Sequence, residues 1–312
     1  MSERTLEVVA AGPFTTVQDL GRPGLAAWGV GRSGVADRRS AALATRVLAN
    51  PLDAALLEVT FGGLSLRAGS AVTVALAGAA APCSVGGRPV PYGAPVAITA
   101  GALLQLGAPR AGVRTYIAVR GGVMVAPVLG SRSYDALARL GPPPLADGDT
   151  LPVGPEPAEW PIVEQAVARP LRGADIGRLT GWAGPHADAL EAGPGAGPDR
   201  WSGAWTVSPA SDRTGLRLDG PSLARRDTGE WPVEGLARGS VQLPPSGRPI
   251  VLLADHPVTG GYPVIGCLDD DSCDRAAQLR PGEPVVLTLS PGPSLERSVG
   301  HAPRPPTPAP PP

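Results

Sequence analysis

The sequence predicts a mainly β protein with few short helices and about two domains. Apolar residues recur at every second position in several short segments, which is the pattern of half-buried strands. The 312 residues include 42 glycines and 39 prolines, which break the chain into many short elements. Hydrophobic residues make up 43% of the chain and charged residues only 18%, so the composition favours a folded protein over a disordered one. Antiparallel barrels or sandwiches fit these observations best.

Ten segments carry the strand pattern, five in each half of the chain. Those of the first half lie at residues 6–8, 72–76, 96–98, 104–106 and 116–118. Those of the second half lie at residues 205–207, 216–218, 240–243, 250–254 and 284–289. Glycine pairs at residues 86–87 and 121–122 predict turns between strands, because glycine adopts the backbone conformations that tight turns need.

Two helices are predicted. The first runs from Asp37 to Ala49, because Asp37 is suited to cap its N-terminus and the Asn-Pro pair at residues 50–51 ends it. The second and shorter helix is expected at residues 272–279. The remainder of the chain is therefore expected to consist of strands, turns and loops.

Prolines concentrate between residues 142 and 161, where the Asp-Gly-Asp sequence at 147–149 also predicts a turn. This change in composition predicts a domain boundary. The expected division is an N-terminal β-barrel-like domain at 1–151, a proline-rich linker at 152–172, a C-terminal β-barrel domain at 173–290 and a disordered proline-rich tail at 291–312.

Composition excludes several kinds of chemistry. All 27 basic residues are arginine, so the chain cannot form a lysine Schiff base, carry biotin on its own lysine or complete a phosphate-binding P-loop. A net charge of −1 lacks the electrostatic footprint of a nucleic-acid-binding protein. Three cysteines without a C-x-x-C pair indicate neither a disulfide framework nor a zinc knuckle, and a reducing cytoplasm is the simplest compartment.

Membrane insertion is not expected. The N-terminal segment lacks an apolar core of signal-peptide length. Uncharged runs at residues 68–87 and 89–109 are long enough to span a bilayer, but glycine, proline and polar residues interrupt both. The sequence therefore predicts a cytoplasmic protein.

The segment GVGRSG at residues 29–34 matches the G-x-G-x-x-G fingerprint of dinucleotide-binding folds. Its context does not fit, because glycine and proline interrupt the preceding segment and strand-like residues follow where a βαβ unit would continue. An aspartate at the start of the following helix would also repel a pyrophosphate. A tight glycine loop leading into a helix is the favoured interpretation.

Histidine and serine give little support for a catalytic centre. His186, His256 and His301 are far apart in the sequence, and no metal site is expected from them. No G-x-S-x-G motif supports a serine nucleophile. Satisfied surface or loop histidines are the favoured interpretation.

Polar clusters stand out within glycine-rich, otherwise apolar segments. They are TTVQDLGRPG at 15–24, SGVAD at 33–37, LEVTFGG at 57–63, GSRS at 130–133, SDRTGLRLDG at 211–220, VQLPPSGRP at 241–249 and ADHPVTGGYP at 254–263. Such loops suit amide or carboxylate substrates, because arginine can clamp an anion, aspartate can act as a base and glycine amides can polarise a carbonyl oxygen. The same pairs also occur as turn chemistry and salt bridges, and the residues alone support both interpretations equally.

These clusters carry a family resemblance. Together with YIAVRGG at 116–122, DGDTL at 147–151 and AQLRPGE at 277–283, they follow in order from about residue 6 to residue 289. The sequence resembles the family of the 5-oxoprolinase C subunit, also named KipA-type, allophanate hydrolase subunit 2 or biotin-dependent carboxyltransferase proteins. The resemblance implies two cyclophilin-like β-barrel domains, in agreement with the strand pattern.

The resemblance also implies a function within a complex. Family members work with a small KipI-like B subunit and with an A subunit of the LamB/YcsF type in the ATP-dependent opening of 5-oxo-L-proline, a small amide, to L-glutamate. No nucleotide motif supports ATP binding within this chain, so ATP is expected to be used by the complex. We therefore expect a hydrolase component that is active in the complex and has no covalently bound cofactor.

Two other functions remain open. Homologous regions of urea carboxylase transfer carboxyl from biotin to urea, and a chain without lysine would need biotin supplied on another chain. The KipA name implies a third function, a non-catalytic module that binds a KipI-like inhibitor of a sensor kinase.

The resemblance identifies ten candidate site residues. The expected catalytic residues are Asp37, Asp212, Asp255 and Tyr262, and the expected substrate-binding residues are Asp19, Arg22, Arg213, Gln242, Gly260 and Gly261. Arginines are expected to bind a carboxylate or a developing oxyanion, Asp37 or Asp255 to transfer protons, and the two glycine amides to polarise the amide oxygen. The chain departs from the family at Val264, where relatives commonly carry a lysine after GGYP.

Overall fold

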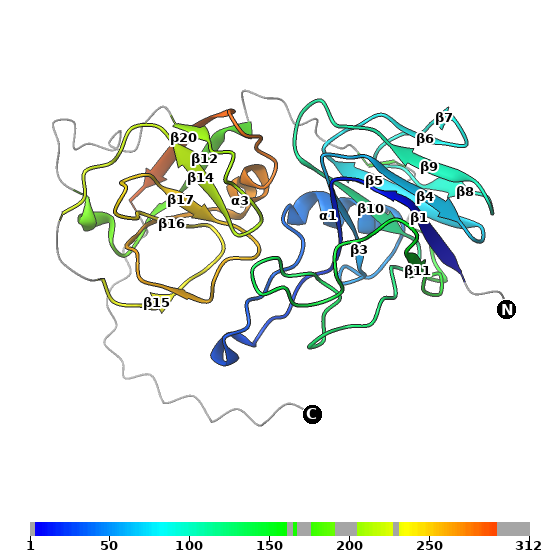
Figure 1. Cartoon of the computed structure of the whole chain (residues 1–312), viewed down its shortest axis with the longest axis horizontal. Coiled ribbons are helices and arrows are strands. Elements are labelled where there is room, and N and C mark those ends of the chain that lie inside the picture. Colours follow the sequence, from blue (N-terminus) through cyan, green and yellow to red (C-terminus); the bar gives the residue numbers. More distant parts are fainter. Residues whose placement is uncertain (1–3, 161–164, 167–175, 191–204, 227–230, 292–312) are drawn as a thin grey trace.

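The computed structural model describes residues 4–160, 165–166, 176–190, 205–226 and 231–291. Within these ranges the protein is mainly β with two α-helices, which confirms the predicted fold class. Two β-rich halves lie side by side, and the helices α1 (Arg38–Val47) and α3 (Asp270–Ala276) face each other at their junction (Figure 1). Three of the ten candidate site residues, Asp37, Arg213 and Asp255, bond across this junction.

The first half consists of two antiparallel sheets. The six-stranded sheet has the order β11 (Thr150–Pro152), β1 (Thr5–Ala11), β4 (Leu64–Ala68), β9 (Leu103–Leu106), β6 (Cys83–Val85) and β7 (Arg88–Pro89). The five-stranded sheet has the order β2 (Phe14–Gln18), β3 (Leu56–Thr60), β10 (Arg114–Val119), β5 (Val72–Gly78) and β8 (Val96–Ile98). Leu6 and Leu66 of the first sheet share one core with Val74 and Ile117 of the second. This half is a sandwich rather than a single closed barrel.

The second half is a closed barrel of seven strands. Their order is β12 (Arg178–Ala183), β19 (Val264–Leu268), β16 (Ser240–Gln242), β17 (Ile250–Leu252), β14 (Gly215–Asp219), β13 (Trp205–Val207) and β20 (Pro284–Ser290). Strand β20 alternates strictly, with Val285, Leu287 and Leu289 buried in the barrel core. A short ribbon of β15 (Glu234–Gly235) and β18 (Thr259–Gly260) lies outside the barrel ladder.

All ten predicted strand segments overlap with strands of the structure, although those at 240–243 and 250–254 extend past the ends of β16 and β17. The strands that the periodicity did not predict include β3, whose sequence is LLEVT. Both faces of β3 are covered, so four successive residues, including the charged Glu58, are buried and no alternation is visible. The periodicity also did not predict strand β2, because its polar residues Thr15, Thr16 and Gln18 are buried and no alternation is visible.

Helix α1 confirms the prediction for residues 37–49, ending slightly earlier. The Asp37 carboxylate accepts a hydrogen bond from the backbone N–H of Ser40 at 2.9 Å and caps the helix. Ala41 and Ala44 present a small-residue face that packs closely on β5 and β10. Asn50 then bonds to the backbone at Val119 and Gly121 and directs the chain away from the sheet.

Helix α3 begins two residues before the predicted start at Ser272. Asp269 caps it, because its carboxylate accepts from the Ser272 N–H at 2.6 Å and from the Thr180 hydroxyl at 2.6 Å. These bonds lower the pKa of Asp269 despite the opposing effect of burial. The predicted helix therefore exists but is shifted toward its cap.

The GVGRSG segment forms the expected glycine loop before α1. Gly29 and Gly34 have φ angles of 75° and 97°, which suit glycine. The strands on either side, β2 and β3, pair antiparallel, so no βαβ unit surrounds the loop. The dinucleotide interpretation thus has no support in the fold.

The segment expected as a linker begins against the first half. Val153 forms a β-bridge with Val123, and Glu156 pairs with Arg4 at 2.7 Å. Most of residues 161–175 and the expected tail at 292–312 lie outside the described residues. The domain limits remain a prediction. No helix in the described ranges has the length and apolar character needed to span a bilayer.

The glycines of the LEVTFGG block serve the fold, and a substitution can test this role. Gly62 has φ +75°, and a Cβ there would overlap the carbonyl oxygen of Gly107. Gly101 has a similar φ of +79° with open space around it. We expect Gly101→Ala to lower the free energy of unfolding by about 1 kcal/mol, and Gly62→Ala to lower it by about 2 kcal/mol more. Urea denaturation measures both, and equal losses would contradict the account.

Candidate functional site

The guanidinium of Arg213 joins the two halves of the protein. Arg213 precedes β14 of the barrel, and its side chain is 3% exposed. Its Nη1 donates to Glu58 Oε1 of β3, and its Nη2 donates to the carbonyl oxygen of Gly34 at 2.6 Å. Burial opposes the charge of Arg213, but the carboxylates of Asp255 and Glu58 outweigh it and raise its pKa. Arg213 therefore carries a permanent buried charge at the junction.

Asp255 is the second member of this cluster. It follows β17 and accepts from Arg213 Nε at 2.8 Å and from Arg213 Nη2 at 3.0 Å, a bidentate pair. Its other partners come from the first half, the Ser33 hydroxyl at 2.6 Å and the Ala136 N–H at 2.9 Å. Both carboxylate oxygens are thus occupied by protein donors.

Glu58 extends the cluster into the sandwich. Its Oε2 accepts from the Tyr116 hydroxyl at 2.9 Å and from the Ala36 N–H at 2.9 Å, while Arg114 Nε lies 3.3 Å from Oε1. Burial raises the pKa of Tyr116, so the phenol stays protonated and donates to the carboxylate. The Tyr116 oxygen in turn accepts from the Asp37 N–H at 2.7 Å, which connects the cluster to the start of α1.

Asp37 lies at the same junction. Besides capping α1, its carboxylate accepts from Gln278 Nε2 at 2.8 Å, and Gln278 belongs to the barrel half. Burial, together with the charge of Asp274, raises the pKa of Asp37 to about 6. Asp37 therefore combines a place at the junction with a carboxyl pKa shifted toward neutrality.

Asp19 and Arg22 organise a different part of the junction. Asp19 accepts from the hydroxyls of Ser131 and Ser133 at 2.6 Å each and from the Arg132 N–H at 2.6 Å. Arg22 donates through Nε to Val128 O at 3.0 Å and through Nη2 to the Ser133 carbonyl oxygen. The two residues therefore fix the GSRS loop.

The remaining expected residues lie on the barrel. Gln242 is buried on β16, and its Nε2 lies 3.4 Å from the carbonyl oxygen of Tyr262. Gly260 ends β18, Gly261 follows it, and Tyr262 is 45% exposed. Asp212 lies next to Arg213 at the surface, and it caps a turn by accepting from the Thr214 N–H at 2.7 Å.

The structure thus brings the ten residues together only in part. Arg213 and Asp255 are in direct contact, and Asp37 reaches them through Tyr116 and Glu58. Asp19 and Arg22 form a neighbouring pair on the loops of the first half, while Gln242 and Tyr262 form a third group with the two glycines. No hydrogen bond or ion pair among the described residues joins the third group directly to the first two.

The sequence did not single out several residues of the cluster. Glu58, Tyr116 and Gln278 all lie within blocks that carry the resemblance, but each was quoted only as part of its block. The available signal was a carboxylate inside the apolar run LLEVT, since a buried charge needs a partner.

Val264 occupies the position of the family lysine. It is buried at the start of β19, and its N–H donates to His186 Nδ1 at 3.1 Å. Because Nδ1 accepts this bond, the imidazole proton is on Nε2, which faces Glu234 at 3.6 Å. The buried valine offers no charge to a ligand.

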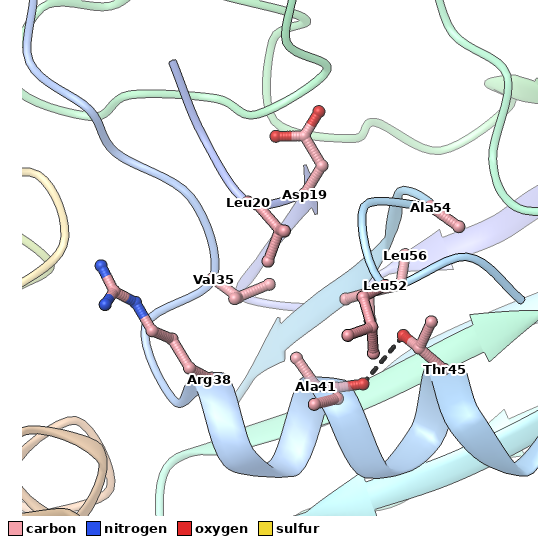
Figure 2. Close-up of a pocket in the computed structure, with 10 residues that line it drawn as sticks. Asp19, Leu20, Val35, Arg38, Ala41, Thr45, Leu52, Ala54 and Leu56 are labelled. Carbon is pink, nitrogen blue, oxygen red and sulfur yellow. Dashed lines mark hydrogen bonds between the residues drawn. The ribbon is translucent and has the colours of Figure 1, made fainter. Parts of the chain in front are cut away.

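A pocket of about 150 Å³ lies beside α1 (Figure 2). Small and apolar side chains line it, including Ala41, Leu52 and Leu56. Figure 2 shows the charged ends of Asp19 and Arg38 directed away from these apolar side chains. The pocket therefore has no convergent polar groups and gathers only Asp19 among the expected residues.

Comparison with known proteins identifies the family. Residues 28–289 match the family described as carboxyltransferase domain, subdomain A and B. The chain belongs to this family. The match includes the sandwich residues that follow η1 (Ala26–Trp28) and all of the barrel except the last residue of β20, so the carboxyltransferase domain contains both sides of the buried junction.

This carboxyltransferase-domain protein matches most of the length of one relative but only part of the length of others. It is 35% identical to the C subunit of 5-oxoprolinase from Escherichia coli K12 over 90% of this chain and 89% of that protein. The crystal structure of TTHA0988 superposes with a TM-score of 0.79 at 34% identity, covering 92% of this chain and 56% of that chain. The structure of K. lactis urea amidolyase superposes with a TM-score of 0.81 at 25% identity, covering 93% of this chain but 19% of that one.

The raised pKa of Asp37 predicts a pH effect on stability. Between the ordinary pKa of 3.8 and the folded value of about 6, the folded chain keeps a proton that the unfolded chain has lost. Raising the pH through this range therefore destabilises the fold, by up to about 3 kcal/mol from this group. Asp37→Asn cannot ionise, so its stability relative to the wild type should increase by about that amount from pH 4 to pH 7.5. Urea denaturation at the two pH values measures the change, and parallel pH profiles would contradict it.

Proposed function

We propose that this chain is the C subunit of an ATP-dependent 5-oxoprolinase, a hydrolase complex that opens 5-oxo-L-proline to L-glutamate. The observation that carries the proposal is the nearly end-to-end match with a protein named as the C subunit of 5-oxoprolinase. A match that covers most of both chains supports equivalent roles for the two proteins. In contrast, urea amidolyase contains this unit as a small part of a much longer chain.

The partners follow from the same proposal. The chain requires a small KipI-like B subunit and an A subunit of the LamB/YcsF type, and the complex rather than this chain uses ATP. The absence of lysine is consistent with this division, because the chain has no P-loop lysine. The complex is proposed to act in the cytoplasm.

The geometry supports different roles for the ten site residues. Arg213 and Asp255 use their polar groups on each other and on the junction, so we assign them to positioning rather than direct substrate contact. Asp37 is proposed to exchange protons, because its raised pKa lies near neutrality. Gln242, Tyr262 and the Gly260–Gly261 amides are proposed to contact the substrate from the barrel side.

The urea reaction is the second candidate, and the superposition on urea amidolyase over most of this chain favours it. Urea and 5-oxoproline both present an unreactive amide. In this alternative the chain transfers a carboxyl group from biotin to urea, and the biotin is attached to another protein. Both candidates place amide activation at the same unit.

Reconstitution tests the proposal. The full chain, mixed with the purified A and B subunits, 5-oxo-L-proline and ATP, should release L-glutamate, and omission of this chain should abolish the release. A variant of Asp53, an exposed carboxylate beyond α1, serves as a matched control for any substituted form. Release of glutamate at the same rate without this chain would reject the proposal. Isolation of the native complex with a biotinylated protein, active on urea and not on 5-oxoproline, would support the second candidate instead.

A further inference from the structure

Arg22 has a buried donor that the protein leaves unused. The residue is 2% exposed, and two of its three guanidinium nitrogens donate to carbonyl oxygens of the loop at 128–133. Its Nη1 is buried and has no hydrogen-bond partner among the described residues. Buried donors of a charged group are almost always satisfied, because leaving one unpaired is costly. The free Nη1 therefore indicates a place for an acceptor from outside the chain.

Asp135 presents an unused acceptor in the same region. It lies in the loop between β10 and β11, two residues beyond the Ser133 carbonyl that Arg22 binds, and is 2% exposed. Its Oδ1 accepts from the N–H groups of Leu137 at 2.9 Å and Ala138 at 3.0 Å, which fixes the orientation of the carboxylate. In the described part of the chain, no hydrogen bond reaches Oδ2.

The space beside Asp135 Oδ2 is bounded by both halves of the protein. A Cβ built on Gly31 would lie 3.4 Å from Oδ2 and 3.4 Å from the carbonyl oxygen of His256. Gly31 belongs to the GVGRSG loop, and its φ lies outside the left-handed region that favours glycine. The turn therefore does not require glycine at this position. The lack of a side chain on Gly31 instead leaves space next to the carboxylate of Asp135.

The local charge disfavours an anionic group at Arg22 and Asp135. The carboxylates of Asp19, Asp135 and Asp255 all lie close enough to Arg22 to act on its pKa, which burial lowers and they raise. Burial and the charge of Asp255 also raise the pKa of Asp135. One free guanidinium nitrogen among three carboxylates would bind a carboxylate or phosphate poorly, whereas a neutral group with one donor and one acceptor satisfies both partners.

We propose that Arg22 Nη1 and Asp135 Oδ2 together bind the amide edge of the substrate, the carbonyl oxygen on Arg22 and the N–H on Asp135. This inference rests on the proposed function and specifies it. A lactam carries its C=O and N–H on the same edge, as urea does, whereas a linear secondary amide is trans and carries them on opposite edges. The pair thus selects cyclic amides or urea over linear peptides, and Asp135 becomes a substrate-binding residue.

Binding of neutral probes to the full chain tests the pair. 2-Pyrrolidinone has the lactam edge without a carboxylate, γ-butyrolactone has the same ring without the N–H, and acetate has only the charge. Titrations followed by NMR should show that 2-pyrrolidinone binds at least about tenfold more tightly than either of the other two. Equal binding of the lactam and the lactone, tighter binding of acetate, or no binding of 2-pyrrolidinone would overturn the proposal.

Two variants localise the binding. In Asp135→Asn, the N–H groups of Leu137 and Ala138 should keep the side-chain oxygen of the asparagine in place. The asparagine Nδ2 then replaces Oδ2, so two donors, Nδ2–H and the substrate N–H, face each other. We expect about a tenfold or greater loss of 2-pyrrolidinone affinity.

Gly31→Ala places a methyl group in the proposed space without backbone strain, and it should weaken binding similarly even if Asp135→Asn fails to fold. Asp149→Asn changes another turn-capping aspartate, which bonds to Ala146, and should bind like the wild type. Wild-type affinity in Gly31→Ala would reject the site.

Failure of the proposed site can be distinguished from failure of the proposed function. If the reconstituted complex opens 5-oxoproline while neither Asp135→Asn nor Gly31→Ala raises its KM, the site is wrong and the proposed function stands. If the complex is inactive on 5-oxoproline while urea binds to the chain and loses affinity in both variants, the site stands and the proposed function is wrong.

Discussion

The placement of the two halves depends on one buried ion cluster. Arg213 enters the sandwich from the barrel and binds Glu58, Asp255 and the Gly34 carbonyl oxygen at once. Burying three charges is costly, and only a full set of partners makes the arrangement tolerable. The planar guanidinium supplies donors in several directions, which a lysine ammonium could not do in this geometry. Strand β3, the loop before α1 and the start of β14 must therefore keep their relative positions.

Hydrogen bonds around the cluster extend the same constraint. Asp274 of α3 accepts from the Arg38 N–H at 2.9 Å, so the acidic face of one helix caps the start of the other. Arg238 of the barrel donates to Ala36 O at 2.9 Å. Gln278 binds both Asp37 and the backbone of Arg114. The junction is polar and specific, which explains why the sequence blocks that carry the family resemblance are rich in charge and yet buried.

The free groups lie beside this fixed framework. Arg22 and Asp135 are held by the loops that the junction orders, since Ala136 donates to Asp255 and Ser33 bonds to it as well. A binding pair set in this way needs little reorganisation when a substrate arrives. Stability and the proposed binding thus fall on adjacent but different residues, and the arginine of the SDRTG block, Arg213, is assigned to stability.

The fold was largely predictable from the sequence, but the site was predictable only in part. Strand β20 alternates perfectly and α1 has a local cap, so short-range patterns predicted both. The bond between Arg213 and Glu58 joins residues 155 positions apart, and no local pattern encodes such a contact. Asp135 was also missed, because a turn-capping aspartate looks the same in sequence whether or not its second oxygen is free.

A double-mutant cycle on Glu58 and Arg213 tests the central claim most directly. Glu58→Gln and Arg213→Met would each remove one charge from the buried cluster and leave the opposite charge with fewer partners, and each should lower the free energy of unfolding by about 3 kcal/mol or more. The double variant should lose much less than the sum of the two, with a coupling energy of at least about 2 kcal/mol. Losses that add to within about 0.5 kcal/mol would show that the two charges act independently and would contradict the account.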